Sequence, residues 1–367
     1  MSQKKLLELC LSPDLGGLEI YMQKCSENLA KNFDVTAVVS EKSRLSERLN
    51  CKRIKKIQLR RGNKFSLITA YQLAKVIDKN KIDIIHCHWT NDLPIAVLAK
   101  KISKRKPKLI QSRHMTMTRF KNDPAHRFIY KNINYIICVT NAVERQIKKF
   151  IPSDIVPETS VLYPGADIVE PITRSERAIL RNDTHGNEQF IVGIVGRITP
   201  DKGQYLLIEA TKKLVEEDIP VKAIIVGHAM ADSYLLDLKE KTKSLGIENN
   251  VLFHDFTNSP EKFMQSCDVM VTASKQETFG LVTVEAMQCG VAVIAANSGG
   301  TLEIIDDNLT GLLFNNEDSA DLALKIKELY VDDGKRKRLS DNGKRKAQTM
   351  FENKKHFFDL GELIKKI

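Results

Sequence analysis

Short apolar runs alternate with helical patterns along almost the whole chain, and this alternation limits the possible folds more than any other feature. Strands that alternate with helices predict parallel sheets covered by helices on both faces. The predicted strands of the first half are Lys5–Leu11, Val35–Val39, Ile82–His86, Lys108–Gln111 and Tyr135–Val139. Those of the second half are Phe190–Val195, Val221–Val226, Val251–Phe253, Val269–Thr272, Val291–Ala295 and Gly311–Phe314.

The length of 367 residues exceeds what one hydrophobic core usually supports, so we expect two domains. Residues 167–189 are polar, contain Pro171 and have no strand-like run, which predicts a linker. Residues 1–166 and 190–340 then form two doubly wound α/β domains in tandem. Such domains bind ligands at the carboxyl ends of their strands, here in an interdomain cleft. Residues 341–367 have helical periodicity and predict a helix packed on the second domain.

The positive charge of the chain belongs to its first half. Residues 1–166 contain 31 Lys and Arg against 14 Asp and Glu, a balance of +17, whereas the remainder has 26 against 32, a balance of −6. Two dense basic stretches, Lys52–Lys64 and Lys100–Lys108, contribute much of this charge. Each stretch alone is typical of a solvated surface. The asymmetry as a whole indicates an anionic partner for the first domain: a membrane surface, a phosphorylated glycolipid or nucleic acid.

Two further features bear on localisation. No apolar run reaches the ~18 residues that span a bilayer, and the first ten residues lack the pattern of a signal peptide. The seven cysteines are scattered and form no Cys-x-x-Cys pair, which is typical of reduced core residues in a cytosolic protein.

The strongest motif is the segment from Glu277 to Glu285. It contains Phe279-Gly280-Leu281, which opens a helix directly after a predicted strand. Gly280 allows the backbone to come close to a ligand, and the free N–H groups of the first helical turn can bind phosphate or sugar oxygens. Carboxylates are acceptors only and suit vicinal diols, so the two glutamates could hold a ribose at one end and a hexose at the other.

Arg197 and Lys202 lie between a predicted strand and Gly203, at the start of the next helix. Departure of a nucleoside diphosphate builds negative charge, and a fixed pair of cations would stabilise that charge. No Asp-x-Asp metal motif occurs in a convincing place, so we expect these cations to act in place of Mg²⁺, with no metal and no cofactor.

The segment Glu277–Glu285 resembles the donor-binding signature of retaining glycosyltransferases of family 4. This large group of GT-B enzymes, the glycosyl transferases group 1, includes lipopolysaccharide and glycolipid transferases. Further similar motifs follow in the order of the family over nearly the whole chain: Gly16-Gly17, Tyr163-Pro164-Gly165, Gly196-Arg197 with Lys202-Gly203, Ser298-Gly299-Gly300 with Glu303, and Thr310-Gly311. The resemblance implies a GT-B fold whose last helix crosses back to the N-terminal domain.

The resemblance also implies roles for single residues. Glu285 would hold the ribose of the donor, and Glu277 a hydroxyl of its sugar. The amides of Phe279, Gly280 and Leu281 would bind sugar or phosphate oxygens. Arg197 and Lys202 would bind the leaving diphosphate.

In the first domain, Gly16 and Gly17 precede a predicted helix, where glycines allow close backbone approach and offer N–H groups to a phosphate. The resemblance points to His114 as a residue near the donor sugar, by its hydroxyls or behind its reactive face.

Acceptor contacts are expected on the same domain. Arg113 and Arg119 flank His114 and could contact an anionic acceptor, and a solvated basic loop is the equal alternative. His86 and His88 form a His-x-His pair, but a metal site would need a third ligand that the sequence does not identify. Packing, or lining of the acceptor site, is therefore the favoured interpretation of His88.

The sequence predicts a hexosyltransferase that uses a nucleoside diphosphate sugar, with UDP favoured over GDP-mannose. Its expected acceptor is a hydroxyl of a lipid-linked or lipopolysaccharide-type glycan, at the inner face of the membrane. One alternative is a transferase acting on a soluble glucan or small acceptor. A nucleic-acid-binding protein is a more distant alternative, because no recognition motif for nucleic acid is present and only 6% of the residues are aromatic.

Overall fold

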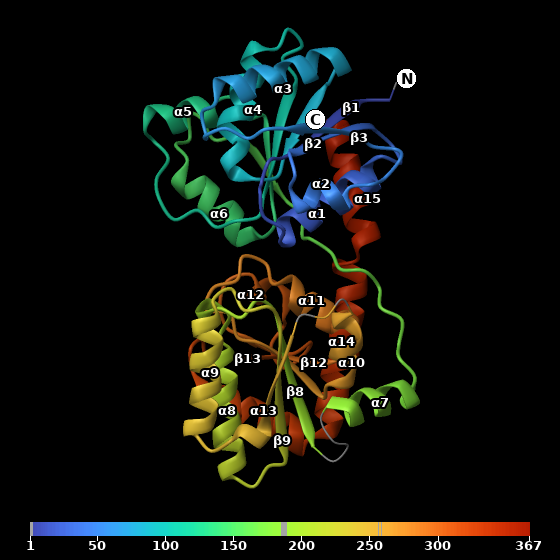
Figure 1. Ribbon diagram of the computed structural model, residues 1–367, viewed down its shortest axis with the longest axis vertical. Coiled ribbons are helices and arrows are strands. Elements are labelled where there is room, and N and C mark those ends of the chain that lie inside the picture. Colours follow the sequence, from blue (N-terminus) through green and yellow to red (C-terminus); the bar gives the residue numbers. More distant parts are fainter. Residues whose placement is uncertain (1–2, 185–188, 256, 258) are drawn as a thin grey trace. The chain divides into compact units, whose positions relative to one another are not determined.

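The computed structural model describes residues 3–184, 189–255, 257 and 259–367, which form two compact units (Figure 1). The first unit contains Met1–Tyr163 together with Lys355–Ile367, and the second contains Pro164–Lys354. Each unit has its own parallel sheet, so the expectation of two Rossmann-like α/β domains is confirmed.

The first unit is built on a parallel sheet with the strand order β3-β2-β1-β4-β5-β6-β7. Its chain order reverses between β1 and β4. The strands are β1 (Lys5–Cys10), β2 (Asp34–Ser40), β3 (Lys55–Leu59), β4 (Ile84–Cys87), β5 (Lys108–Arg113), β6 (Tyr135–Cys138) and β7 (Glu158–Val161). The helices of this unit are α1 (Gly17–Leu29), α2 (Arg44–Arg48), α3 (Leu67–Asn80), α4 (Leu93–Ile102), α5 (Pro124–Tyr130), α6 (Asn141–Phe150) and α15 (Asn353–Lys366).

The two edge strands of this sheet, β3 and β7, are absent from the sequence-based prediction. Both are largely exposed or half-buried, and β3 lies within the basic stretch Lys52–Lys64. An edge strand needs no continuous apolar run, because only part of its surface packs on the core. Part of the basic stretch is therefore sheet edge.

The second unit contains a parallel sheet with the order β10-β9-β8-β11-β12-β13, which reverses between β8 and β11. Helices α8 and α9 lie on one side of it and α10 and α14 on the other (Figure 1). Its strands are β8 (Phe190–Val195), β9 (Val221–Val226), β10 (Val251–His254), β11 (Val269–Thr272), β12 (Ala292–Ala296) and β13 (Leu312–Phe314). Its helices are α7 (Arg174–Thr184), α8 (Gln204–Glu216), α9 (Asp232–Ser244), α10 (Pro260–Ser266), α11 (Leu281–Gln288), α12 (Thr301–Ile304), α13 (Ser319–Val331) and α14 (Asp333–Met350).

The predicted linker, residues 167–189, contains helix α7. Arg181 donates two hydrogen bonds of 3.1 Å to Asp268 Oδ2, and Arg177 donates one of 3.1 Å to Asp268 Oδ1, so α7 is attached to the second unit. The helix is polar and mostly exposed, which explains why no apolar periodicity reveals it. Residues 185–188 of the predicted linker lie outside the described residues.

The C-terminal segment forms two helices, where the sequence predicts one. Ala166 N–H donates to Phe351 O at 2.9 Å, and Asn353 N–H donates to Ala166 O at 3.0 Å. These two bonds use backbone groups of the segment between α14 and α15, so the single predicted helix is interrupted there. Phe357, Leu360 and Ile364 of α15 then join the apolar core of the first unit.

Among the described residues, no helix combines the length and the apolar character that crossing a bilayer requires.

Candidate active site

In the second unit, two loops meet where the chain order of the sheet reverses. Strand β8 is followed by Arg197 and a short turn that ends at Lys202, and its neighbour β11 is followed by the loop that contains Glu277. Lys202 Nζ lies 2.7 Å from Glu277 Oε2, with about a quarter of each side chain exposed (23% and 25%). The structure thus brings together two of the predicted residues, at the carboxyl ends of parallel strands, where open α/β sheets bind ligands.

Glycines allow these loops to pack backbone against backbone. Gly203 has φ +70°, and a Cβ at this position would lie 2.2 Å from Ala273 O. Gly299 has φ +59°, and its Cβ would lie 2.1 Å from Glu277 O. The next residue, Gly300, donates its N–H to Glu277 O at 2.8 Å. The loops after β8 and β12 therefore fix the backbone of the loop after β11, and with it the position of Glu277.

Arg197 combines a fixed backbone with an exposed side chain. Its carbonyl accepts a 2.9 Å hydrogen bond from the amide of Gln204, a buried residue at the start of α8. A guanidinium so placed can reach a bound anion at small cost in backbone entropy.

Helix α11 begins as the sequence predicts. Gly280 precedes it in the left-handed conformation, with φ +102°. Phe279 is buried, with its ring 5.8 Å from that of Phe351, while Leu281 is exposed. Glu285 is half-buried on the second turn. In the first turn of α11, Thr283 N–H donates to Gly280 O at 2.9 Å, which leaves the amides of Leu281 and Val282 as the donors for a ligand.

In the first unit, Gly16 and Gly17 begin helix α1 after β1. Gly16 N–H donates to Glu19 Oε2 at 2.8 Å, so the helix caps its own first turn. A Cβ at Gly17 would meet nothing within 4 Å. The space beside this turn is open, whereas Gly203 and Gly299 are closely covered.

His114 follows β5 and packs against aromatic rings. The Tyr21 ring meets it edge-on at 4.6 Å, and the Tyr21 hydroxyl lies 2.8 Å from Nε2 of His356 on α15. Burial, followed by the neighbouring His88, holds the pKa of His114 well below its usual value. The ring is therefore neutral at pH 7. Its Nε2 is buried and has no hydrogen-bond partner among the described residues.

Of the three residues predicted to contact an acceptor, Arg119 alone is exposed. His88 is buried. Arg113 is buried as well, and its guanidinium donates to Met115 O at 2.7 Å and Thr116 O at 2.8 Å. These bonds hold the loop after His114, and they occupy two guanidinium nitrogens of Arg113 that an acceptor contact would otherwise use.

Four residues of the first unit escaped sequence analysis: Glu8, Tyr21, Cys25 and His356. Glu8 lies within the apolar run of β1, is fully buried and pairs with His86 and His88. Burial alone would raise the pKa of Glu8, but the two imidazoles lower it to about 2. A charged residue inside an apolar strand is the signal that could have revealed this group.

Known proteins resemble the chain in both sequence and structure. A family model described as "Glycosyl transferases group 1" matches residues 176–346, and "Glycosyl transferase 4-like" matches residues 8–140. The uncharacterized glycosyltransferase MJ1178 of Methanocaldococcus jannaschii is 27% identical, over 93% of this chain and 92% of its own.

Two solved structures show the same fold. HepE of Anabaena, solved in complex with UDP, has a TM-score of 0.87 at 23% identity and covers 99% of this chain and 100% of its own. WaaG, a glycosyltransferase involved in lipopolysaccharide biosynthesis, has a TM-score of 0.71 at 17% identity, with coverages of 98% and 99%. With two parallel-sheet units of this topology, and with relatives named glycosyltransferases over nearly its whole length, this chain is a glycosyltransferase with the GT-B fold, and its second unit is similar to the glycosyl transferases group 1.

Proposed function

We propose that the enzyme transfers a hexose from a UDP-sugar, with retention of anomeric configuration, to a hydroxyl of a lipid-linked or lipopolysaccharide-type glycan. The observation that carries the donor half of this proposal is the Lys202–Glu277 pair at the reversal point of the second sheet. HepE, of the same fold, was solved with UDP, which supports uridine as the base.

The donor is held by groups of both signs. Lys202 and the exposed Arg197 bind the diphosphate and stabilise the charge that develops as it leaves, a role that needs no metal ion. Glu277, fixed by its ion pair with Lys202, accepts a hydrogen bond from a hydroxyl of the sugar. Glu285 accepts from the ribose, and the first-turn amides of α11 bind sugar or phosphate oxygens.

Retention follows if the acceptor attacks from the face that the diphosphate leaves. In that step the acceptor oxygen bonds to the anomeric carbon as the carbon–phosphate oxygen bond breaks, and the departing phosphate oxygen takes the acceptor's proton. His114 is neutral, so it can exchange hydrogen bonds with a sugar hydroxyl without adding positive charge.

The acceptor half of the proposal rests on the first unit, which has 34 Lys and Arg against 16 Asp and Glu, a balance of +18. The second unit contains the remaining 23 Lys and Arg and the remaining 30 Asp and Glu, a balance of −7. Helix α3 adds apolar contact area, because Ile68 (75% exposed) and Tyr71 (53%) lie about one turn apart on its surface, with the exposed Lys75 one turn further on. Exposed apolar residues among lysines are typical of helices that lie in an anionic membrane surface.

A thermal-shift screen tests the donor half. UDP-, GDP- and ADP-sugars are added to the wild type and to Lys202→Ala. A UDP-sugar at 100 times its Kd should stabilise the wild type by about 2.7 kcal/mol, and the variant much less. Equal shifts in both proteins would remove Lys202 from the donor site, and a shift with another base alone would remove the UDP assignment. The anomeric configuration of the product, read by NMR, tests retention.

Liposome flotation tests whether the first unit binds an anionic membrane, as the acceptor half of the proposal requires. The variant Ile68→Glu is compared with Leu324→Glu. Leu324 is a similarly exposed apolar residue (61%) on α13 of the acidic unit. At low salt, anionic vesicles should bind the wild type and Leu324→Glu but not Ile68→Glu. Equal binding of all three would exclude α3 as the contact. Transfer to a soluble glucan at the same rate would exclude a lipid-linked acceptor.

A further inference from the structure

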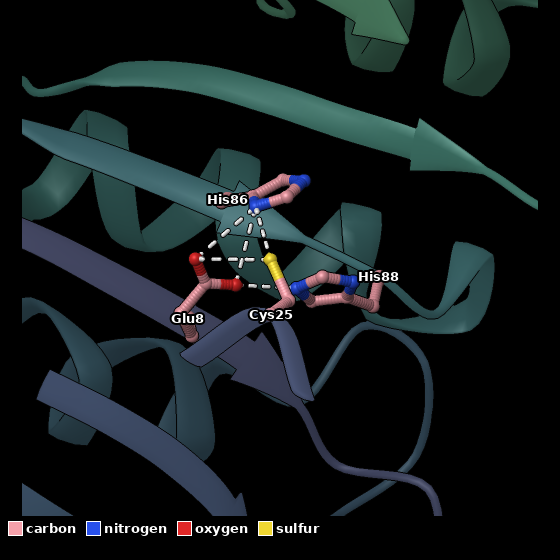
Figure 2. Close-up of side chains that lie close together, drawn as sticks. All are labelled: Glu8, Cys25, His86 and His88. Carbon is pink, nitrogen blue, oxygen red and sulfur yellow. Dashed lines mark hydrogen bonds and ion pairs between the residues drawn. The ribbon is translucent and has the colours of Figure 1, made fainter. Parts of the chain in front are cut away.

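Four potential metal ligands converge inside the first unit (Figure 2). Glu8, Cys25, His86 and His88 each offer one ligand atom, and these four atoms all lie within 4.8 Å of one another. All four residues are buried. The His-x-His pair of the sequence thus acquires the third ligand that its spacing could not identify, and a fourth.

The parallel sheet creates this cluster. In the register of β1 and β4, Glu8 pairs directly with His86. Because side chains alternate along a strand, Glu8 shares the face of Leu6, and His86 shares that of Ile84. Both of these apolar residues belong to the core that α1 and α15 cover. Cys25 reaches the cluster from α1, and His88 lies two residues beyond His86, just after β4 ends.

The distances suit a tetrahedral ion. Zinc bonds of 2.0–2.3 Å place neighbouring ligand atoms roughly 3.3–3.8 Å apart. His86 Nδ1 lies 3.1 Å from Glu8 Oε2, and Cys25 Sγ lies 3.8 Å from Glu8 Oε1 and 4.0 Å from His86 Nδ1. His88 Nε2 contacts Glu8 Oε2 directly, so this pair must separate as an ion enters.

The ligand set also suits zinc chemically. Zinc is bound by thiolate, imidazole and carboxylate groups, and sites with four protein ligands are structural. A divalent ion with one carboxylate, one thiolate and two neutral imidazoles has no net charge, which lowers the cost of burying it. On the far side of the His86 ring, Nε2 lies 2.8 Å from Ser112 Oγ, a hydrogen bond that keeps Nδ1 toward the cluster.

We propose that Glu8, Cys25, His86 and His88 bind one structural Zn²⁺ inside the first unit. All four ligands belong to the first unit, whereas Arg197 and Lys202, the proposed ligands of the diphosphate, belong to the second. Because all four ligands are buried, the ion enters while the unit folds, and its binding free energy adds to the stability of that unit.

Metal analysis of the untagged full-length enzyme, produced in zinc-supplemented medium, tests the proposal. The wild type should contain about one zinc per chain. Cys25→Ser should contain less than about a tenth of that. Cys87→Ser is the matched control, since Cys87 lies between His86 and His88 in the sequence but is not part of the cluster. Its thiol instead donates to Trp89 O at 3.4 Å. This control should keep its zinc.

Cobalt substitution gives a second readout. Refolding with Co²⁺ should produce a thiolate-to-cobalt charge-transfer band and strong tetrahedral d–d bands in the wild type and in Cys87→Ser. Cys25→Ser should lose the charge-transfer band. If Cys25→Ser fails to fold, Glu8→Gln, which keeps the size of the side chain, should weaken zinc binding at least about tenfold in competition with a chelator.

Two results would overturn the proposal. One is a folded wild type that holds less than about a tenth of an ion per chain, both as purified and after refolding with zinc or cobalt. The other is a full zinc content in folded Cys25→Ser and folded Glu8→Gln. Either result would leave the four residues as a hydrogen-bonded core network.

Discussion

The two units share the strand order 3-2-1-4-5-6, yet they use the reversal point of that order differently. In the second unit, Lys202 and Glu277 pair above the sheet and remain partly exposed. In the first unit, Glu8 and His86 pair within the sheet and are buried. The same topology therefore positions charges for a ligand when they follow the strands, and for the core when they lie on the strands.

The largest expected difference concerns the two glutamates. Glu8→Ala leaves two imidazoles without their buried partner and should destabilise the first unit by about 3–5 kcal/mol. Glu277→Ala breaks a partly exposed pair and should cost less than about 1 kcal/mol. Urea unfolding followed by the fluorescence of Trp89, the single tryptophan, reports on the first unit, and circular dichroism reports on the whole chain. Similar losses of unfolding free energy in both variants would contradict the distinction between a buried pair in the first unit and a partly exposed pair in the second.

Turnover, in contrast to stability, should depend strongly on the partly exposed pair of the second unit. Lys202→Ala should lower kcat by about 10²–10³-fold, because it removes a cation that stabilises the leaving diphosphate. Lys275→Ala is the control, since this exposed lysine of the same loop pairs with Glu317 at 2.8 Å. The control should retain near-normal kcat, and both variants should unfold at the wild-type temperature. A normal kcat in Lys202→Ala would remove the residue from the site.

Substitution of a closely covered glycine of the second unit should cost more stability than substitution of an open glycine of the first unit. Gly299→Ala places a Cβ against Glu277 O in a left-handed conformation and should destabilise the second unit by roughly 1–3 kcal/mol. Gly17→Ala meets open space and should stay within about 0.5 kcal/mol of the wild type. Chemical denaturation of both variants checks this expectation. A tolerated Gly299→Ala would show that the loops are not packed as tightly as described.

The smallest effect is a pH dependence of the first unit. Burial lowers the pKa of His356 to about 4, although the Tyr163 carbonyl and Asp359 oppose this. The unfolded chain takes up a proton near pH 6.5 and the folded unit does not, so stability is lost as the pH falls from 6.5 towards 4. At pH 5 the loss should be of order 1–2 kcal/mol.

The variant His356→Gln isolates this contribution. It should flatten the decline in the urea midpoint between pH 7 and pH 5, again followed by Trp89 fluorescence. An unchanged slope would show that His356 does not titrate between those limits.

Sequence reasoning predicted the parts that depend on local pattern. The buried strands of both sheets follow from apolar runs, and the start of α11 directly after Gly280 follows from the motif there. The placement of Lys202 and Glu277 in loops that follow strands also follows from the pattern, whereas their roles at a donor stay predictions. Strands β3 and β7 and helix α7 did not follow from the pattern, because exposed elements need no apolar periodicity. The burial of His88 and Arg113 was also beyond prediction, since it depends on cross-strand register and on loop carbonyls far along the chain.

The path of the chain has a consequence for how this enzyme is made. The first unit is synthesised first, but its core includes Phe357, Leu360 and Ile364 of the last helix. During translation, roughly two hundred residues of the second unit must emerge before that core can close. Of the two units, the one that is synthesised earlier is therefore the one whose core closes later, and any loss of the final turns of α15 leaves that core incomplete.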